Sequence, residues 1–337
     1  MKTAPPLSVL FPVRNGEGVV RNALGSLSRQ TFSDFEVIVV NDGSTDGTGE
    51  ILQALSKKDP RIRVFHRDPG GIVPALEFAR AQAGGLYLAR MDADDGAFAQ
   101  RFQHQMDLMR SDRRMSLCGT GVVYFPRETI RDGAVRYESW INELTSHDAI
   151  VRDLFIECPI PHPTFLVNAE VLDLVGGYRA MGWPEDYDLV LRIWEGGGYF
   201  GKVPEPLLRW REGEGRLSRT HEDYSPDAFR RCKVHFLLRT HLRKGRGVIV
   251  WGSGPVGKAF ARELVSQGGT LLGFADLDPR KVGQEIYGVR VFHPDQALLL
   301  GGAFSVAAVG KSGGRDEIRR ALREGGRVEI EDYVAIA

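Results

Sequence analysis

Acidic residues gather at three places in this sequence, and their types and spacing could support metal binding and acid–base chemistry. The groups are Asp42 in an NDGS turn, Asp92, Asp94 and Asp95 in a DADD turn, and Glu185 with Asp186 in the segment WPEDYDL. Carboxylates placed this close repel one another, and a divalent cation, which prefers oxygen ligands, is a common way to offset the repulsion. A solvated turn or a helix cap explains any one group alone. The three groups together favour a chemical site.

The first 100 residues alternate between strand and helix patterns, and this rhythm positions the first two acidic groups. We predict strands at 7–13, 35–40, 63–66 and 86–91, and helices at 17–30, 47–55 and 74–83. Asp42 follows the second of these strands and Asp92 follows the fourth. Because open α/β sheets bind ligands beyond the carboxyl ends of parallel strands, we expect both turns at one edge of one sheet.

The third acidic group is predicted to begin a helix. Leu189, Ile193 and Trp194 have helical spacing, which places Glu185 and Asp186 in the first turn, where the helix dipole tolerates negative charge. Elsewhere between residues 100 and 206 the pattern is less regular. We expect a mixed sheet and several helices there.

Several segments, in this order, resemble the family-2 inverting glycosyltransferases, which have a GT-A fold. They are LSVLFPVRNGEGVVRNALGSLSRQTFSDFEVIVVNDGSTDGTGEI, then LYLARMDADD followed by Arg101, then HPTFLVNAEVLDLVGGYR and WPEDYDLVLR. The resemblance covers roughly residues 7–220. It implies an α/β fold of the GT-A (nucleotide-diphospho-sugar transferase) type, a mixed sheet flanked by helices. It also implies sugar transfer from a nucleotide-diphosphate sugar to an acceptor hydroxyl, in polysaccharide or glycoconjugate synthesis.

The resemblance implies roles for single residues at the positions that match the family's motifs. Asp94 would hold a divalent metal, Mn²⁺ or Mg²⁺, and Asp186 would be the general base. The donor nucleotide would contact Pro12, Arg14, Glu17, Asp42 and Asp92.

Elementary chemistry supports the two catalytic roles independently. Breaking the bond from the anomeric carbon to a diphosphate places negative charge on the leaving group, which a cation held by Asp94 can stabilise. An acceptor hydroxyl is a poor nucleophile until a carboxylate accepts its proton, and Asp186 is the residue that we expect to do so. Glu185 is expected to orient its neighbour or to cap the helix.

The sequence also departs from the family's pattern. Family members often carry a histidine soon after an arginine in a YR-x-H segment, whereas this chain has Arg211-Glu212-Gly213 and no histidine until His221. The histidine ligand of the family is therefore not carried over to this chain. Arg211 is a candidate contact to the diphosphate, as is Arg216, and a solvated loop is an equally good interpretation of both. For His162, which lies between two prolines, a structural role is favoured.

A second β-α-β pattern begins at residue 248, after a glycine-rich break. Gly252, Gly254 and Gly257 form a G-x-G-x-x-G loop between a predicted strand and helix, and Asp276 ends the next strand. This context fits a dinucleotide fingerprint, in which backbone amides approach a pyrophosphate and the acid binds ribose. The segment resembles the small Rossmann-like domains attached to sugar-modifying enzymes. NAD(P) binding stays open, and a scaffold or dimerisation role is favoured because only about 90 residues are present.

These patterns predict a three-part organisation. Residues 1–225 form a glycosyltransferase domain, residues 226–245 a linking helix, and residues 246–337 a small Rossmann-like α/β domain. The helix predicted at 226–244 is rich in Arg, Lys and His, but its apolar residues form no single stripe. Packing between domains is therefore favoured over a membrane surface.

Composition limits the partners. The 44 basic residues balance the 44 acidic ones, so no net field favours nucleic acid. No apolar run is long enough for a transmembrane segment. Three scattered cysteines indicate a reducing compartment, and we expect a cytoplasmic protein. Peripheral membrane association, oligomer formation and the acceptor, whether saccharide, lipid-linked or protein, stay open.

Three other functions compete with sugar transfer. A sugar nucleotidyltransferase would also place aspartates at sheet edges, but it would show a glycine-rich basic loop after the first strand, and VRNGEGVV is not one. A pyridine-nucleotide-dependent sugar-modifying protein, acting through the C-terminal domain, would need a catalytic Tyr–Lys pair that is not evident. A non-catalytic nucleotide-sugar-binding module is disfavoured by the presence of Asp42, Asp94 and Asp186.

Overall fold

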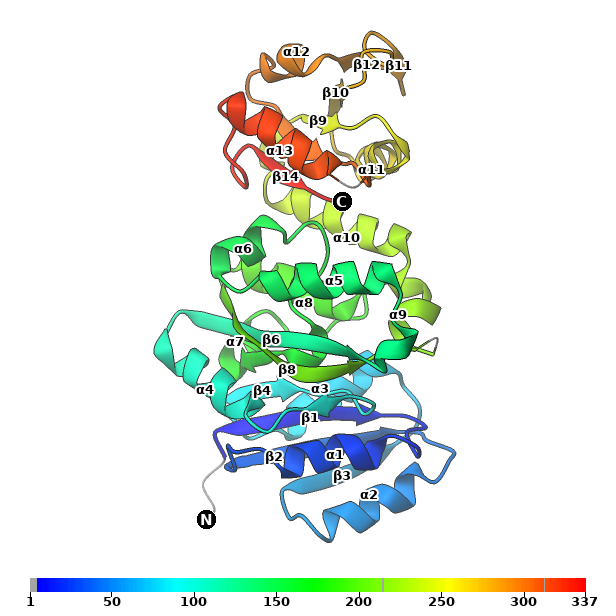
Figure 1. Ribbon diagram of the computed structural model, residues 1–337, viewed down its shortest axis with the longest axis vertical. Helices are drawn as coiled ribbons and strands as arrows, with labels where there is room; N and C mark the ends of the chain where they lie inside the picture. Colours follow the sequence, from blue (N-terminus) through cyan, green and yellow to red (C-terminus); the bar gives the residue numbers. More distant parts are fainter. Residues whose placement is uncertain (1–4, 214, 312) are drawn as a thin grey trace. The chain divides into compact units, whose positions relative to one another are not determined.

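A computed structural model describes residues 5–213, 215–311 and 313–337 of the chain (Figure 1). The chain divides into two compact units, each of which is described by itself. Unit 1 contains the described residues of 1–150, 159–181 and 185–216. Unit 2 contains those of 151–158, 182–184 and 217–337.

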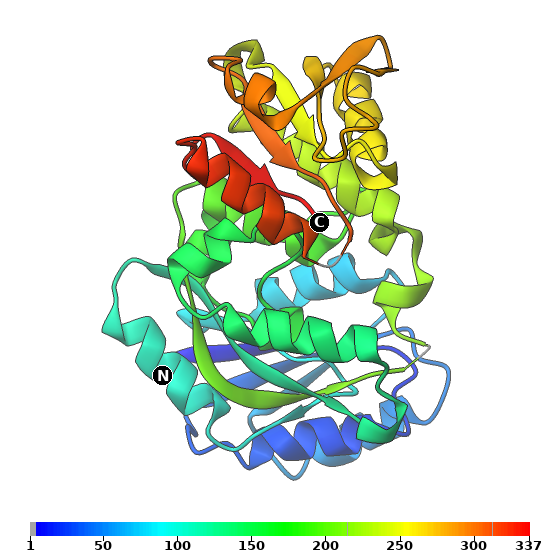
Figure 2. The same cartoon turned by 45° about the horizontal axis from the view of Figure 1, so that its top comes forward.

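Unit 1 is built on one mixed sheet, whose strand order in the described residues is β3-β2-β1-β4-β7-β6-β8-β5. The strands are β1 (Leu7–Val13), β2 (Phe35–Asp42), β3 (Ile62–Arg67), β4 (Tyr87–Arg90), β5 (Gly96–Ala97), β6 (Met115–Phe125), β7 (Leu166–Asn168) and β8 (Tyr199–Arg211). The first four run parallel, β7 is antiparallel to β4 and β6, and β6 and β8 pair in parallel as two long curved strands (Figure 2). The predicted mixed sheet flanked by helices is confirmed.

The central strands form because most of their residues are apolar. All residues of β1 and β2 are buried, as expected of parallel strands covered on both faces. Helices connect the strands and return the chain to the same edge. They are α1 (Val20–Ser28), α2 (Thr48–Ser56), α3 (Ile72–Gln82) and α4 (Arg101–Ser111). The elements predicted before residue 100 are present, with ends that differ by a few residues.

The second half of unit 1 adds helices and short turns around β6, β7 and β8. They are η1 (Arg127–Thr129), α5 (Asp132–Glu143), α6 (His147–Arg152, which ends in unit 2), η2 (His162–Thr164), α7 (Ala169–Leu174) and α8 (Glu185–Glu195). Helix α8 begins at Glu185, as the sequence predicts. Most of α8 is buried, because every residue from Tyr187 to Ile193 is covered.

Unit 2 contains a second sheet, with the order β11-β12-β10-β9-β13-β14 in the described residues. Its strands are β9 (Val248–Trp251), β10 (Leu271–Ala275), β11 (Glu285–Ile286), β12 (Val289–Phe292), β13 (Phe304–Ala307) and β14 (Tyr333–Ala335). All pair in parallel except β11, which forms a hairpin with β12. The helices are α9 (Leu217–Thr220), η3 (Glu222–Tyr224), α10 (Pro226–Arg239), η4 (Arg243–Gly245), α11 (Pro255–Ser266), α12 (Pro294–Leu298) and α13 (Gly314–Glu324).

Helix α10 ends earlier than the sequence predicts. The regular helix stops at Arg239, and the chain turns through Thr240 before the short η4 turn. The Nζ of Lys233 donates hydrogen bonds to the carbonyls of Ile156 and Ile336, so residues from three segments of unit 2 meet at this helix. Because α10 has neighbours on several sides, its apolar residues form no single stripe.

Cys118, Cys158 and Cys232 are buried, and no disulfide joins them in the described residues. Among the described residues, no helix is both long and apolar enough to cross a membrane.

Candidate active site

The parallel strands bring the first two acidic turns to the same edge of the sheet. Strand β1 lies between β2 and β4, with Val13 opposite Asn41 and Leu10 opposite Arg90. Asp42 ends β2, and Asp92 follows β4 by two residues. The predicted placement of both turns at one edge is confirmed.

Asp42 has a structural contact that the sequence did not reveal. The side chain is 4% exposed, and its two oxygens accept hydrogen bonds from the backbone N–H groups of Gly70 and Gly71, each at 2.8 Å. Gly71 has a φ of +88°, which favours glycine at this position. Asp42 therefore fixes the loop that leads into α3. Each carboxylate oxygen keeps a second lone pair that a ligand can use.

The other predicted nucleotide-pocket residues lie at the end of β1 and in the turn after it. Pro12 is buried within the strand, and Arg14 is exposed in the turn. The carboxylate of Glu17 accepts a hydrogen bond from the N–H of Gly47 at 3.0 Å. This bond ties residues 14–17 to the loop that follows Asp42.

The DADD turn is held from two sides. Arg90 Nη2 donates to Asp92 Oδ1 at 2.6 Å. On the other side, the N–H of Arg211 donates to Asp95 Oδ1 at 2.8 Å, and Arg211 Nε donates to the carbonyl of Asp94 at 2.9 Å. Asp95 Oδ2 is buried and has no hydrogen-bond partner among the described residues. Arg211, a candidate from the sequence, thus lies at the turn itself.

The turn carries the charge repulsion that its spacing predicts. Burial, and after it the charge of Asp92, raises the pKa of the Asp94 carboxyl. Burial and both neighbouring aspartates raise the pKa of Asp95 well above its usual range. Arg216 opposes these shifts at both groups, so it contributes positive potential at the turn. Ionising the neighbouring carboxyls of Asp94 and Asp95 together is unfavourable. A positively charged ligand would stabilise the ionised pair.

A cavity of about 430 Å³ lies against the turn. Its lining includes the charged residues Arg21, Arg29, Asp94, Asp95, Arg209 and Arg211. Arg21 and Arg209 were not singled out from the sequence, because α1 and β8 come together only in the fold. Arginines beside carboxylates suit a ligand that carries both phosphate oxygens and a cation.

The start of α8 presents acids with different environments. Glu185 is 4% exposed, whereas Asp186 is half-buried, and Asp186 Oδ1 accepts a hydrogen bond from the N–H of Tyr187 at 2.7 Å. Asp188 is buried in an ion pair with Arg192 at 2.7 Å. Asp188 is therefore part of a buried ion pair, whereas Asp186 is the more exposed of the two carboxylates.

His162 contacts this acidic helix start, which the sequence did not indicate. Its Nδ1 lies 3.5 Å from Glu185 Oε1, and its Nε2 lies 3.2 Å from the hydroxyl of Tyr178. Burial, and after it the charge of Arg90, lowers the pKa of His162 well below its usual value. The imidazole is therefore neutral. No periodic pattern could link positions 162 and 185.

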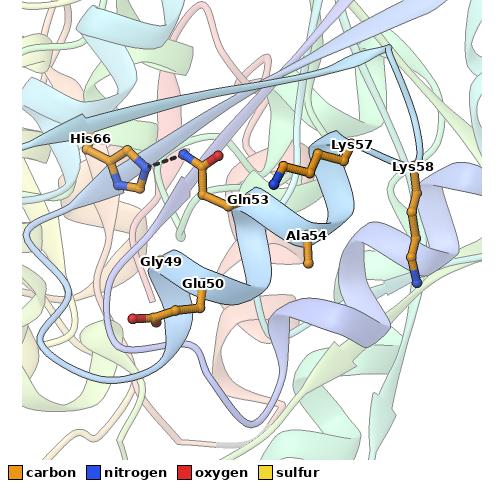
Figure 3. Close-up of a pocket in the computed structure, with 7 residues that line it drawn as sticks. All are labelled: Gly49, Glu50, Gln53, Ala54, Lys57, Lys58 and His66. Atoms are coloured by element: carbon orange, nitrogen blue, oxygen red, sulfur yellow. Dashed lines mark hydrogen bonds between the residues drawn. The ribbon is translucent and has the colours of Figure 1, made fainter.

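A larger surface cavity, of about 700 Å³, lies at α2 and β3 and contains none of the predicted site residues. Figure 3 shows Gln53 reaching from α2 toward His66, with their nitrogens 3.2 Å apart. Lys57 and Lys58 project from the end of the same helix. Ordinary surface residues account for this cavity, and it is separate from the acidic turns.

In unit 2, the three glycines of the predicted fingerprint differ in what requires them. A Cβ at Gly257 would lie 1.9 Å from the carbonyl oxygen of Gly252, and a Cβ at Gly252 would lie 2.4 Å from Val309. A Cβ at Gly254 would meet nothing within 4 Å. Packing therefore requires Gly252 and Gly257, while it does not require Gly254.

Asp276 closes the same loop. Asp276 Oδ2 accepts hydrogen bonds from the N–H and hydroxyl of Ser253, at 2.9 and 2.5 Å, and from Lys281 Nζ at 2.9 Å. Burial raises the pKa of this carboxyl, but the hydrogen bonds, those of Ser253 first, outweigh burial and lower it. The carboxylate thus already has partners at the position where the fingerprint places a ribose.

The described residues contain no group of three or more His, Cys, Asp or Glu side chains arranged to hold a metal ion. The DADD turn supplies at most part of a ligand set.

Comparisons with known proteins agree with this geometry. Residues 8–174 match the family described as "Glycosyl transferase family 2". The putative glycosyltransferase EpsE of Bacillus subtilis (strain 168) is 26% identical over 232 residues, which cover 67% of this chain and 80% of that protein. The uncharacterized glycosyltransferase EpsJ of the same strain is 40% identical over 99 residues, or 29% of each protein.

A solved structure shares the fold. Residues 1–349 of Staphylococcus aureus TarS, in complex with UDP-GlcNAc, match 71% of this chain and 68% of that chain, with a TM-score of 0.57 and 18% identity. The fold is therefore the mixed α/β fold of the GT-A glycosyltransferases. The family match and the relatives support a family-2 glycosyltransferase.

Proposed function

We propose that this chain is a metal-dependent, inverting glycosyltransferase that moves a sugar from a nucleotide-diphosphate sugar to an acceptor hydroxyl. The observation that carries the proposal is the partly buried DADD turn. Its carboxylates repel one another beside a cavity lined with arginines. The family match and the GT-A fold support the same activity.

The residues of the turn fit a divalent cation. Asp94 would hold the ion, and the unpartnered Oδ2 of Asp95 offers a second oxygen beside it. A partial protein ligand set suits Mg²⁺ or Mn²⁺, which complete their coordination with substrate phosphates and water. When bound, the cation stabilises the charge that develops on the leaving diphosphate.

The donor nucleotide is assigned to the edge formed by β1, β2 and β4. Asp42 and Asp92 follow neighbouring strands of that edge, and Pro12, Arg14 and Glu17 lie at the end of β1. Arg211 and Arg216 place positive charge near the DADD turn, where a diphosphate needs it. The UDP-GlcNAc bound to TarS, which shares the fold, supports a nucleotide-sugar donor.

Asp186 is assigned as the general base. It is half-buried in the first turn of α8, and its neighbour Glu185 is buried against His162. Accepting the proton of the acceptor hydroxyl during attack makes that oxygen a competent nucleophile. A carboxylate on the side of the sugar opposite the leaving group gives inversion at the anomeric carbon.

The proposal is tested by calorimetry of UDP and GDP binding with and without Mn²⁺. Wild type should bind one of them at least about tenfold more tightly with Mn²⁺, and Asp94→Asn should remove that gain. Asp107→Asn, an exposed acid on α4, is the control and should keep it. If neither nucleotide binds, or if Mn²⁺ helps Asp94→Asn as much as wild type, the proposed metal-dependent donor site is wrong.

The acceptor class, whether saccharide, lipid-linked or protein, is not assigned. The three cysteines are buried and form no disulfide in the described residues, which fits a reducing compartment, and we propose the cytoplasm.

For unit 2 we propose a Rossmann-like fold that binds a nucleotide, with NAD(P) as a candidate. The open space at Gly254 favours this role, because no packing contact explains the glycine and a backbone free of side chain lets a phosphate approach. Asp276 would have to exchange a bond from Ser253 or Lys281 to reach a ribose. If NAD⁺, NADP⁺ and nucleotide sugars all show no saturable binding to the Asp94→Asn variant, unit 2 is a scaffold.

A further inference from the structure

Arg90 is a buried cation whose hydrogen bonds do not account for its position. It ends β4, is 2% exposed, and uses Nη2 to hold Asp92 at 2.6 Å. Its Nε and Nη1 are buried and have no hydrogen-bond partner among the described residues. Buried donors left unsatisfied are costly, and natural proteins rarely keep them without a functional reason.

A neighbouring arginine shows the contrast. Arg101 is fully buried, and it donates to Gln105 Oε1, to the Met91 sulfur and to the carbonyl of Arg90. Each guanidinium nitrogen of Arg101 therefore has a partner, as a structural arginine should. Arg90, at the end of β4, has a hydrogen-bond partner within the described part of the chain for only one of its three guanidinium nitrogens.

Charge explains where Arg90 lies. Burial lowers its pKa, but the charge of Asp92 and its hydrogen bond to Arg90, with the charge of Glu185 adding to them, contribute to a pKa that is raised overall. Asp92 belongs to the donor turn, and Glu185 begins α8. Arg90 is thus near the two acidic groups that the proposed reaction needs.

The same charge also organises the contacts of Glu185. Arg90 is the neighbour that, after burial, disfavours protonation of His162. A neutral imidazole has one donor and one acceptor nitrogen. The Tyr178 hydroxyl can donate to Nε2, which leaves Nδ1–H to face the Glu185 carboxylate at 3.5 Å. The charge of Arg90 therefore affects both His162 and Glu185, whose side chains lie 3.5 Å apart.

We propose that Arg90 is a positioning residue shared by the two halves of the transferase site. One nitrogen fixes the Asp92 carboxylate on the donor side, and the charge of the guanidinium holds Glu185 and so the first turn of α8, where Asp186 lies. The inference rests on the proposed function, because it assigns the donor to Asp92 and the base to Asp186. Arg90 thereby couples donor binding to the placement of the base.

The test is a double-mutant cycle between Arg90 and Glu185 in the full chain. The variants are R90M, R90K, E185Q and R90M/E185Q. One readout is release of nucleoside diphosphate from UDP-GlcNAc, UDP-glucose and GDP-mannose with Mn²⁺, using whichever donor wild type consumes. The second is the affinity for the matching nucleoside diphosphate with Mn²⁺. The control cycle is R192M with E185Q, because Arg192 is a buried arginine on α8 that pairs with Asp188.

We expect R90M to lower turnover by about tenfold or more and to weaken nucleotide affinity as well, since both acidic partners lose their cation. R90K keeps the charge and should recover part of both losses. In the E185Q background R90M should cost at least about fivefold less turnover than in wild type, because contacting residues are not additive. The turnover losses caused by R192M and by E185Q should multiply when the two substitutions are combined.

Two results overturn the inference while leaving the transferase intact. In the first, the turnover losses of R90M and E185Q multiply in the double variant, as those of R192M and E185Q are expected to do. The other is R90M with unchanged nucleotide affinity and turnover. A wild type that binds neither nucleotide and consumes none of the donors contradicts the proposed function itself, and the role of Arg90 with it.

Discussion

Side chains of one type have different roles in this molecule, and only some of those roles can be read from spacing. Asp92, Asp94 and Asp186 stand out in the sequence because acids gather there, and the structure keeps them at strand and helix ends. The two hydrogen bonds of Asp42 to the loop before α3 could not be predicted. They join residues 28 and 29 positions apart, and no local pattern encodes that distance.

Asp42→Asn tests this structural role. The amide has one acceptor oxygen instead of two, so one of the N–H groups of Gly70 and Gly71 loses its partner, at a cost of about 1–3 kcal/mol. We expect faster hydrogen exchange in residues 68–72 together with a lower melting temperature. Asp107→Asn, which changes an exposed acid, is the control. Unchanged exchange in this loop would contradict the role.

The contacts of His162 likewise could not be predicted from the sequence. The sequence favoured a structural histidine, and the ring is indeed buried and neutral. Its place between Tyr178 and Glu185 depends on how η2, α8 and the chain between them fold. Neither composition nor periodicity predicts that arrangement.

Elements were more predictable than contacts. Continuous apolar runs and helical spacing located the strands and helices of the first 100 residues, since burial on both faces of a parallel sheet leaves a clear pattern. The end of α10 at Arg239 was missed, because the residues up to Lys244 have no proline or glycine to break a helix. The turn at Thr240 is set by packing.

Helix α10 gives a pH prediction. Burial lowers the pKa of Lys233 to about 8, against 10.5 for an ordinary lysine. Between these values the unfolded chain binds more protons than the folded one, so this residue makes folding more favourable as pH rises from about 8 to 10.5. The melting temperature of wild type should therefore rise relative to Lys233→Met across that interval. A difference that stays constant with pH would exclude the shift.

The glycine loop between β9 and α11 gives a second prediction at this scale. Gly257→Ala should destabilise unit 2 by about 1–3 kcal/mol, because its Cβ would overlap the carbonyl oxygen of Gly252. Gly254→Ala should stay within about 0.5 kcal/mol of wild type, because its Cβ would meet open space. Thermal unfolding of both variants measures this. Equal destabilisation would mean that Gly254 is also a packing glycine.

The same pair of variants probes the proposed nucleotide role of unit 2. If a phosphate approaches the loop, Gly254→Ala should weaken binding of NAD(P) or a nucleotide sugar although the fold is intact. Binding that is unaffected by this methyl group would argue that the ligand lies elsewhere.

At the scale of the whole molecule, the sequence predicts two α/β parts, and the described residues divide into two compact units. The division is not a single cut, because residues 151–158 and 182–184 belong with the second unit. Arg319 shows why, since it pairs with Asp153 at 2.7 Å across 166 positions of sequence. A glycine break can mark where a new β-α-β pattern begins, but it cannot show which earlier segments pack against that pattern.

The fold and the family match locate the chemistry in unit 1. Both acidic turns, the arginine-lined cavity and the start of α8 belong to that unit. The proposed sugar transfer has donor binding at the DADD turn and proton acceptance at α8 as separable steps. The account therefore depends most on Asp186.

Turnover of Asp186→Asn at saturating donor and Mn²⁺ is the most direct measurement. The amide keeps the shape and loses the basicity, so transfer should fall by about 10² to 10⁴ while the affinity for nucleoside diphosphate stays within about twofold. Glu185→Gln should cost less than Asp186→Asn, because Glu185 orients and does not accept the proton. Near-normal transfer by Asp186→Asn, with the acceptor that wild type uses, would contradict the assignment of the base and the mechanism built on it.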